Sequence, residues 1–416
     1  MKKTSVFIFL LCVLTSRNLC SQFILAERVL GMRVEGLQLA KFPVALMNSQ
    51  PVTISFDVNT QQPEYLRLKI IHCDRNWNPT PSSFVNNESL MSPLTQIPYE
   101  EAPAGVGHYR WTYAFQLPGF DRFEQFRFSG NYRVEIWNQY YTELLAFAKI
   151  FVAEEENDSA LSIERYQLPS EVFPMNQANR ISFCYAIPSE KDFNQEYIDR
   201  NFLRTVDVYT NRKILQPRRI DVDDTDPFTF VKGWTTSKLI FRVDNILPGN
   251  EYRTLDFRSV DFYPPGKTVV SIYGADVPRF FQQGKSDNDG ASSIIVGSRF
   301  ADYEYVQFEL ISTRTGKNDS VSVVGDFNAW NPSARWAMSY DSTKERYYLT
   351  ALLRRGQYDY QYVQGKEWYA LEGNDWRTMN VYTAFLYYRD PNLGGYDRIL
   401  LSAQQKGPRQ DDNDAK

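Results

Sequence analysis

Alternation of apolar and polar residues with a period of two dominates this chain. In residues 52–58 (VTISFDV) every second side chain is apolar, as expected for a strand with one buried face. The same pattern predicts further strands at 65–71, 109–115, 132–137, 180–187, 205–210, 239–243, 268–273, 306–311, 321–324, 347–352, 358–363 and 382–388. Clusters of proline and glycine separate them, and helical periodicity is scarce. The pattern therefore predicts an all-β fold built from β-sandwiches.

The strands fall into three units. The acidic stretch at 154–158 marks a first boundary, and a third strand-rich unit begins near Ala301. Tyr132 precedes an alternating run, as a tyrosine-corner residue of an immunoglobulin-like domain does. We therefore predict three tandem immunoglobulin-like sandwiches of the E-set type. The predicted ranges are 22–157, 158–300 and 301–402, followed by a disordered polar tail at 403–416.

The N-terminus has the features of a secretory signal at residues 1–21. Lys2 and Lys3 precede a short apolar run at 6–14, which is too short to span a membrane. Cleavage after Ser21 fits the preference for small residues. Lipidation of Cys20 is the less favoured alternative, because small residues do not precede it. The mature chain is expected to be exported, without inserting into a membrane itself.

Composition narrows the possible functions. Of the 416 residues, 15% are aromatic, including 27 Tyr and 28 Phe, which suits half-buried pleated sheets. The net charge is −4, so no basic surface for nucleic acid is expected. His72 and His108 are the two histidines of the sequence, which leaves little room for histidine acid–base chemistry or a histidine metal site.

Motifs for catalysis do not appear in the sequence. It holds no nucleophile elbow, phosphate-binding loop or zinc-protease motif, so we expect neither an enzyme nor a cofactor. The acidic loop at 221–226 is interpreted as a solvated turn. Residues 287–290 are interpreted as a hairpin turn, because Ser298 stands where a calcium loop needs glutamate. Cys73 and Cys184 either stay as free thiols or form one disulfide, and the sequence leaves both open.

Three later stretches carry a resemblance to a known family. They are 249–253 (GNEYR), 324–330 (VGDFNAW) and 356–362 (GQYDYQY). In this order they resemble a Bacteroidota family of unknown function that includes the Plug protein of the type IX secretion system. The resemblance implies that certain residues serve the structure of the family. These residues are Gly249, Asn250, Glu251, Arg253, Gly325, Phe327 and Asn328.

The resemblance also implies a function. Plug-like proteins are periplasmic and associate with the large outer-membrane barrel of the type IX translocon, SprA or Sov. They close its periplasmic opening by steric means and catalyse no reaction. We therefore expect a periplasmic protein that is held at the outer membrane through this protein partner.

Residues 320–370 resemble a second family, the family-48 carbohydrate-binding modules. Trp330 and Trp368 correspond to the two tryptophans that stack on sugar in those modules. Gln361 stands where a sugar-contacting lysine often occurs, and this departure argues for the fold without sugar binding. The alternative function is an exported glycan-binding protein that uses this C-terminal unit. Trp330, Trp368 and Gln361 are the candidate contacts for a partner protein or a glycan.

Overall fold

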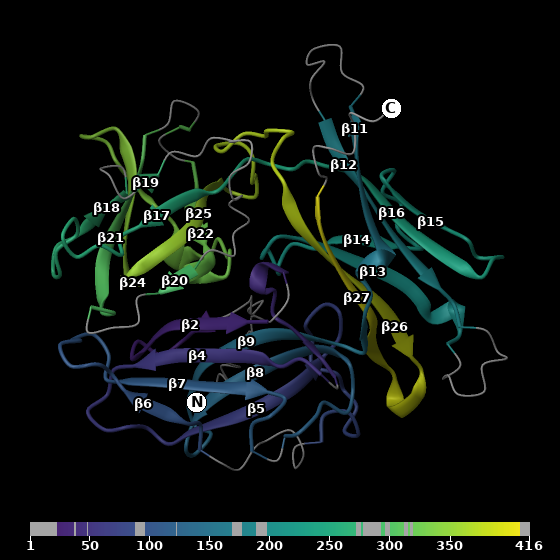
Figure 1. The fold of residues 1–416 in the computed structure, drawn as a ribbon, viewed down its shortest axis with the longest axis horizontal. Helices are drawn as coiled ribbons and strands as arrows, with labels where there is room; N and C mark the ends of the chain where they lie inside the picture. Colours follow the sequence, from purple (N-terminus) through teal and green to yellow (C-terminus); the bar gives the residue numbers. More distant parts are fainter. Residues whose placement is uncertain are drawn as a thin grey trace, which may run out of the picture.

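Strands make up nearly all of the regular structure. The computed structural model describes residues 23–36, 39–47, 49–87, 96–121, 123–168, 177–188, 198–271, 276–277, 293–295, 300–311, 315–316 and 319–407. These residues contain short 3-10 helices and no α-helix. Their sheets pack in pairs around three separate hydrophobic cores, so the predicted all-β fold is confirmed (Figure 1). The immunoglobulin-like topology stays a prediction.

The N-terminal domain comprises residues 23–153. One sheet has the order β1-β9-β8-β5, with β3 also beside β9, and the other has the order β2-β4-β7-β6. Apolar side chains from the inner faces of both sheets form its core. The elements are β1 (Phe23–Ile24), β2 (Val29–Glu35), η1 (Leu39–Lys41), β3 (Val44–Leu46), β4 (Val52–Val58), β5 (Leu66–Cys73), β6 (Tyr99–Glu101), β7 (Trp111–Leu117), β8 (Gly130–Asn138) and β9 (Leu144–Ala153).

The second domain is formed by two separate parts of the chain, 155–246 and 380–407, and we call it the split domain. Its sheets have the orders β10-β27-β26-β13-β14 and β11-β12-β16-β15. They share one core. The elements are β10 (Glu155–Glu156), η2 (Asp158–Ala160), β11 (Leu161–Gln167), β12 (Gln177–Ala186), η3 (Arg200–Phe202), β13 (Leu203–Thr210), β14 (Arg218–Asp221), β15 (Thr229–Lys232), β16 (Lys238–Ile246), β26 (Asn380–Asp390), η7 (Asn392–Gly394) and β27 (Tyr396–Gly407).

The third domain, residues 253–364, lies between these two parts, and we call it the inserted domain. Its sheets have the orders β19-β17-β25-β20, with β22 also beside β25, and β18-β21-β24-β23. The elements are β17 (Arg253–Asp256), β18 (Val269–Val270), β19 (Asp276–Val277), β20 (Ser293–Ile295), β21 (Tyr303–Leu310), β22 (Val321–Gly325), η5 (Asp326–Asn328), η6 (Ala334–Trp336), β23 (Ser339–Asp341), β24 (Arg346–Arg354) and β25 (Gly356–Gln364).

The sheets divide the chain differently from the predicted ranges. β26 and β27 were expected in the C-terminal unit, but β26 pairs along its length with β13 of the split domain. β17 was expected in the middle unit, but it pairs with β25 of the inserted domain. Residues 403–407, expected in a disordered tail, continue β27, whereas 408–416 lie outside the described residues. The physical reason is that β13 and β26, which lie before and after the inserted domain in the sequence, pair in one sheet of the split domain.

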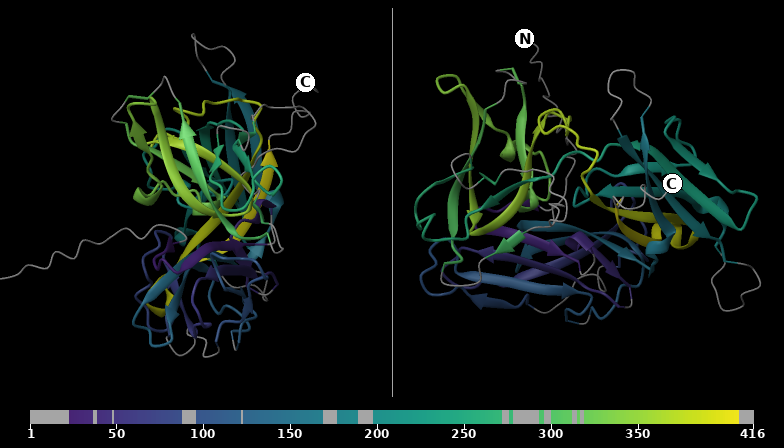
Figure 2. Two further views of the ribbon diagram at one scale, coloured as in Figure 1. Left: turned by 90° about the vertical axis from the view of Figure 1, so that its left-hand side faces the viewer. Right: turned by 45° about the horizontal axis from the view of Figure 1, so that its top comes forward.

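The three domains contact one another. The N-terminal domain lies along one side of the molecule, and the inserted and split domains lie next to each other upon it (Figures 1 and 2).

Cys73 in β5 and Cys184 in β12 are both free thiols, which settles the alternative left open by the sequence. Tyr132 donates its hydroxyl hydrogen bond to the Phe128 carbonyl at 2.7 Å, the bond that defines a tyrosine corner.

Candidate functional site

The predicted motif residues at 249–253 lie where the chain passes from the split domain into the inserted domain. Gly249 accepts a hydrogen bond from the Asp375 N–H at 2.6 Å, on the segment that returns to the split domain. Asn250 Nδ2 donates to the Glu372 carbonyl oxygen at 3.0 Å. Arg253 forms an ion pair with the Glu372 carboxylate at 3.2 Å. We call this pair of adjacent segments, 247–253 and 365–380, the crossing.

Gly249 and Glu251 also have clear local roles in the crossing. Gly249 has φ +81°, and a Cβ there would lie 2.9 Å from the Tyr369 ring, so glycine is required by both backbone and space. Glu251 is buried beside Gly249 in the same crossing. These residues hold the outgoing and returning segments together, which limits independent movement of the inserted domain.

The motif residues at 325–328 form the turn after β22. Asn328 Oδ1 accepts from the Gly325 N–H at 3.0 Å, and its Nδ2 donates to the Val323 carbonyl at 3.1 Å. A Cβ on Gly325 would lie 2.6 Å from the Asp359 carbonyl oxygen. Phe327 packs against Trp336 with ring centroids 4.8 Å apart. The turn places Asp326 beside Arg212 of the split domain, whereas Phe327 packs against the core of the inserted domain.

The three residues predicted to contact a partner protein or a glycan are buried. Trp330 is 1% exposed, and its ring lies 4.3 Å from that of Tyr252. Gln361 and Trp368 do come together, because Gln361 Nε2 donates to the Trp368 carbonyl oxygen at 3.1 Å. Trp368 is 9% exposed. Stacking on sugar needs an open ring face, so this arrangement gives no support for glycan binding at these residues.

The face of Trp368 is instead occupied by Lys213 of the split domain. Its Nζ lies 4.7 Å from the Trp368 ring centroid and 5.3 Å from that of Tyr252. The ring faces favour the ammonium form. Burial opposes it and dominates, so it lowers the pKa of Lys213 to about 7, and Glu372 offsets only part of this. A lysine–aromatic contact thus joins the split domain to the crossing.

Arg212 contacts all three domains. Its Nε forms an ion pair with Asp326 of the inserted domain at 2.8 Å, and both side chains are 8% exposed. Its Nη1 donates to the Lys41 carbonyl at 2.7 Å, and its Nη2 donates to the Val34 carbonyl at 3.1 Å, both in the N-terminal domain. Sequence reasoning missed Arg212, because an arginine in a turn carries no signal of long-range contacts.

The N-terminal and split domains meet through an aromatic cluster that we call the apolar interface. Its central side chains are fully buried. They are Phe42, Phe151, Tyr209 and Phe385. The rings of Phe151 and Phe385 stack with centroids 4.6 Å apart. This composition resembles the core of a single domain, so relative motion here is disfavoured.

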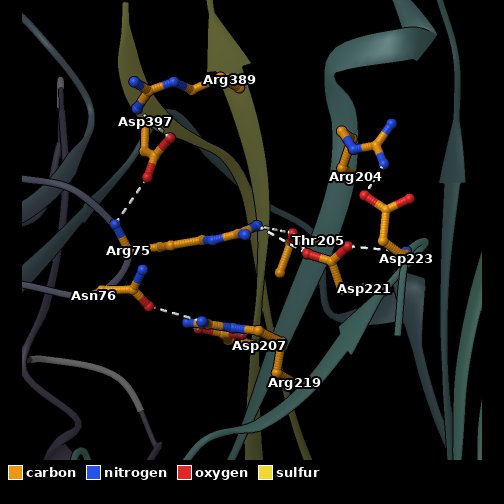
Figure 3. Close-up of polar contacts among 10 residues, drawn as sticks. All are labelled: Arg75, Asn76, Arg204, Thr205, Asp207, Arg219, Asp221, Asp223, Arg389 and Asp397. Carbon is orange, nitrogen blue, oxygen red and sulfur yellow. Dashed lines mark hydrogen bonds and ion pairs between the residues drawn. The ribbon is translucent and has the colours of Figure 1, made fainter. Parts of the chain in front are cut away.

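A polar cleft of about 380 Å³ lies between the same two domains (Figure 3). The Arg75 N–H donates to Asp397 at 2.9 Å, and its guanidinium forms an ion pair with Asp221 at 3.0 Å. Beside it, Asn76 accepts from Arg219 at 2.7 Å. Each contact joins the N-terminal domain to the split domain (Figure 3). The cleft therefore reinforces the apolar interface with directional bonds.

Charges in this cleft are compensated locally. Burial raises the pKa of Asp221, but hydrogen bonds from Thr205 and the Asp223 N–H, together with Arg75, outweigh it and lower the pKa below its usual value. The carboxylate of Asp207, which is 0% exposed, pairs with Arg219 at 2.8 Å. No cluster of His, Cys, Asp or Glu suited to a metal ion occurs among the described residues.

The N-terminal and inserted domains meet through what we call the polar interface. Asp57, 0% exposed, forms an ion pair with Arg354 at 2.9 Å and accepts the Tyr303 hydroxyl hydrogen bond at 2.7 Å. Arg354 also donates to the Tyr109 hydroxyl at 2.8 Å. His108 lies beside them and pairs with Asp302 at 3.1 Å.

The other histidine has a structural environment. His72, in β5, is buried, and its ring nitrogens contact Thr80 Oγ1 at 2.8 Å and the Ser129 carbonyl at 2.9 Å. Burial lowers the pKa of His72 to about 4. The imidazole is therefore neutral at ordinary pH.

None of the helices in the described part of the chain has the length and apolar character needed to cross a membrane.

Comparison with known proteins supports the predicted resemblance. Residues 30–155 match the family model described as the type 9 secretion system plug protein 1st domain. This match confirms the resemblance over the N-terminal domain and indicates a cell-envelope role connected with type IX secretion, in a kind of domain that is not catalytic. The resemblance to carbohydrate-binding modules stays a prediction.

Solved structures show the fold. A hypothetical protein from Parabacteroides merdae has a TM-score of 0.69 at 19% identity, over 93% of this chain and 99% of that chain. The dimeric latent PorU from Porphyromonas gingivalis has a TM-score of 0.11 at 9% identity, over 91% of this chain and 34% of that chain. The second likeness is too small for an argument. No curated protein matches the chain.

Proposed function

We propose that this protein is a periplasmic plug or accessory subunit of the type IX translocon. It binds the periplasmic opening of the outer-membrane barrel and blocks it as a folded body, without catalysing a reaction. The match of residues 30–155 to the plug family supports this proposal. The motif residues Asn250 and Arg253 support it further, because they hold together the two chain segments that connect the split and inserted domains.

The joining of the three domains is the observation that carries the proposal. A body that closes a wide opening must keep its shape, and tandem domains on free linkers move relative to one another by default. Here Arg212 contacts all three domains, and two chain segments connect the split and inserted domains. Such a body suits steric occlusion.

Co-purification tests the proposal. The tagged protein is captured from native membranes, and the barrel is expected to be enriched by mass spectrometry. Deletion is expected to raise the entry of vancomycin, a large antibiotic, and re-expression is expected to restore the barrier. If the barrel is not enriched and deletion leaves permeability unchanged, the proposal is wrong.

Variants connect this test to the structure. Arg212→Ala removes the contacts that join the domains, so it is expected to restore the barrier less well than the wild type at equal protein level. Lys232→Ala is the matched control, because Lys232 is exposed on β15 and away from the interfaces. Equal restoration by both variants would show that domain joining is not needed.

A further inference from the structure

A groove of about 350 Å³ lies between the N-terminal and inserted domains. One wall is β2, the edge strand of its sheet, which contributes Leu30 and Met32. The opposite wall contributes Phe327, Trp336 and Leu352. The walls are therefore largely apolar. The volume lies at the lower end of the range of ligand pockets, enough for one or two large side chains.

The charged groups of the groove are mainly basic. Arg33 and Arg335 both line it, and the guanidinium of neither forms a hydrogen bond or ion pair with a residue that the structure describes. Its other charged groups already have partners, since Arg354 pairs with Asp57 and Asp326 pairs with Arg212. Two guanidinium groups thus remain available to a ligand, and they favour a carboxylate.

Polar groups also line the apolar part of the groove. The side chains of Asn331 and Ser333 form no hydrogen bond with another described residue. A hydrocarbon chain would remove them from water without replacing those hydrogen bonds, which costs free energy. A peptide backbone supplies both donors and acceptors. The lining therefore favours a peptide over the tail of a lipid.

We infer that this groove binds an extended peptide segment of a partner protein, with a large apolar side chain next to a carboxylate. The apolar side chain packs between Leu30 and Trp336, and the carboxylate meets Arg33 or Arg335. This inference does not depend on the proposed function, because any partner with such a segment satisfies it.

Binding of defined peptides tests the inference. The probes are fluorescein-labelled Asp-Leu-Phe-Asp and Lys-Leu-Phe-Lys. Both carry the same label and the same blocked termini, so only their side chains differ in charge. Fluorescence polarisation with the mature chain is expected to show at least about tenfold tighter binding of the acidic peptide. Arg335→Glu and the pair Arg33→Glu/Arg335→Glu are expected to weaken it about tenfold or more, with the order of the two peptides reversed in the double variant.

Matched variants separate binding from folding. Lys232→Glu makes the same kind of charge change on the split domain and is expected to leave binding unchanged. Arg335 is exposed, so Arg335→Glu is expected to fold even if Arg33→Glu does not. Leu352→Asn, in the opposite wall, is expected to weaken both peptides equally.

Three outcomes would overturn the inference. The first is equal binding of acidic and basic peptides by the wild type, and the second is unchanged acidic-peptide binding in Arg335→Glu. The third is displacement of the labelled acidic peptide by sodium laurate at a concentration at which unlabelled Asp-Leu-Phe-Asp does not displace it. That result would assign the groove to an acyl chain.

Discussion

The N-terminal domain contacts its two neighbours through interfaces of opposite chemistry. Toward the split domain it presents Phe42 and Phe151, which pack with Phe385 in a fully buried aromatic cluster. Toward the inserted domain it presents Asp57, which binds Arg354 and the Tyr303 hydroxyl beside an open groove. The first interface resembles a domain core, and the second is a small set of directional bonds.

This difference teaches how three sandwiches can form one body and still adjust. Burial of apolar area stabilises an association strongly and without direction. A buried ion pair gains little net free energy, because desolvation offsets its attraction, yet breaking it is costly. We therefore expect the N-terminal and split domains to unfold together, and the inserted domain to separate from the N-terminal domain first.

The largest effect is expected at the apolar interface. Phe385→Ala removes a fully buried ring and should lower the free energy of unfolding by about 3–5 kcal/mol. Urea denaturation followed by tryptophan fluorescence measures this. Phe262→Ala is the control, because Phe262 is 82% exposed and its loss should change stability by no more than about 0.5 kcal/mol. Similar losses in both variants would contradict the core-like interpretation.

The next effect concerns the polar interface. Asp57→Ala leaves the Arg354 guanidinium and the Tyr303 hydroxyl without their acceptor, at a cost of about 3 kcal/mol. Hydrogen exchange should rise in β2 and β21 and stay low in β9 and β26. Adding Arg354→Leu should recover part of the loss, because the unpaired charge is then gone. Equal exchange in all four strands would remove the distinction between the interfaces.

Alternation revealed many of the strands, including β4, but it did not reveal β9 or β27. Residues 52–58 were predicted with the bounds of β4, whose side chains alternate in burial at its start. β9 is buried along nearly all of its length, so its apolar run LLAFAKIFVA carries no alternation. β27 was missed for another reason: polar residues such as Asp397, Arg398 and Ser402 are buried along it, so polarity does not mark an exposed face. The alternation of apolar and polar residues along a strand indicates only which faces of that strand are buried.

The domain insertion and the interfaces escaped prediction for a different reason. The pairing of β13 with β26 joins residues more than 170 positions apart, and no local signal marks it. Motif residues such as Gly249 and Asn328 were predicted to be structural, and the structure shows them in the crossing and in the turn next to Arg212. Their partners depend on tertiary structure, so sequence could identify these residues but could not show what they contact.

A smaller loss of stability is expected at Gly31, where the two domains of the polar interface approach each other closely. Gly31 has φ +54°, and a Cβ there would overlap the Tyr303 hydroxyl, so Gly31→Ala should cost about 1–3 kcal/mol. Tyr303→Phe should relieve part of this in the double variant, because it removes the overlapping oxygen. Gly266→Ala is the control: its φ is +78°, with no atom within 4 Å of the added Cβ. Additive losses in a urea double-mutant cycle would argue against close contact.

The smallest change in stability is expected at the contact of Lys213 in the split domain with Tyr252 and Trp368 in the crossing. The pKa of Lys213 is about 7 in the folded chain, below the value of about 10.4 in an unfolded chain. Between these values the unfolded chain binds the additional proton, so stability should rise with pH, by about 1.4 kcal/mol from pH 6 to pH 8. Below pH 7 the cost of burying the charge is fully present.

Substitution isolates this contribution. Lys213→Met roughly keeps the length of the side chain and removes the charge. The unfolding free energy of the wild type should rise from pH 6 to pH 8, whereas this contribution is absent from the variant, so the value for the variant minus that for the wild type should fall. Lys232→Met, on exposed β15, should show no such trend. If the Lys213→Met difference is flat with pH, the ring faces of Trp368 and Tyr252 hold the ammonium charged, and this contact belongs with the polar interface rather than the apolar one.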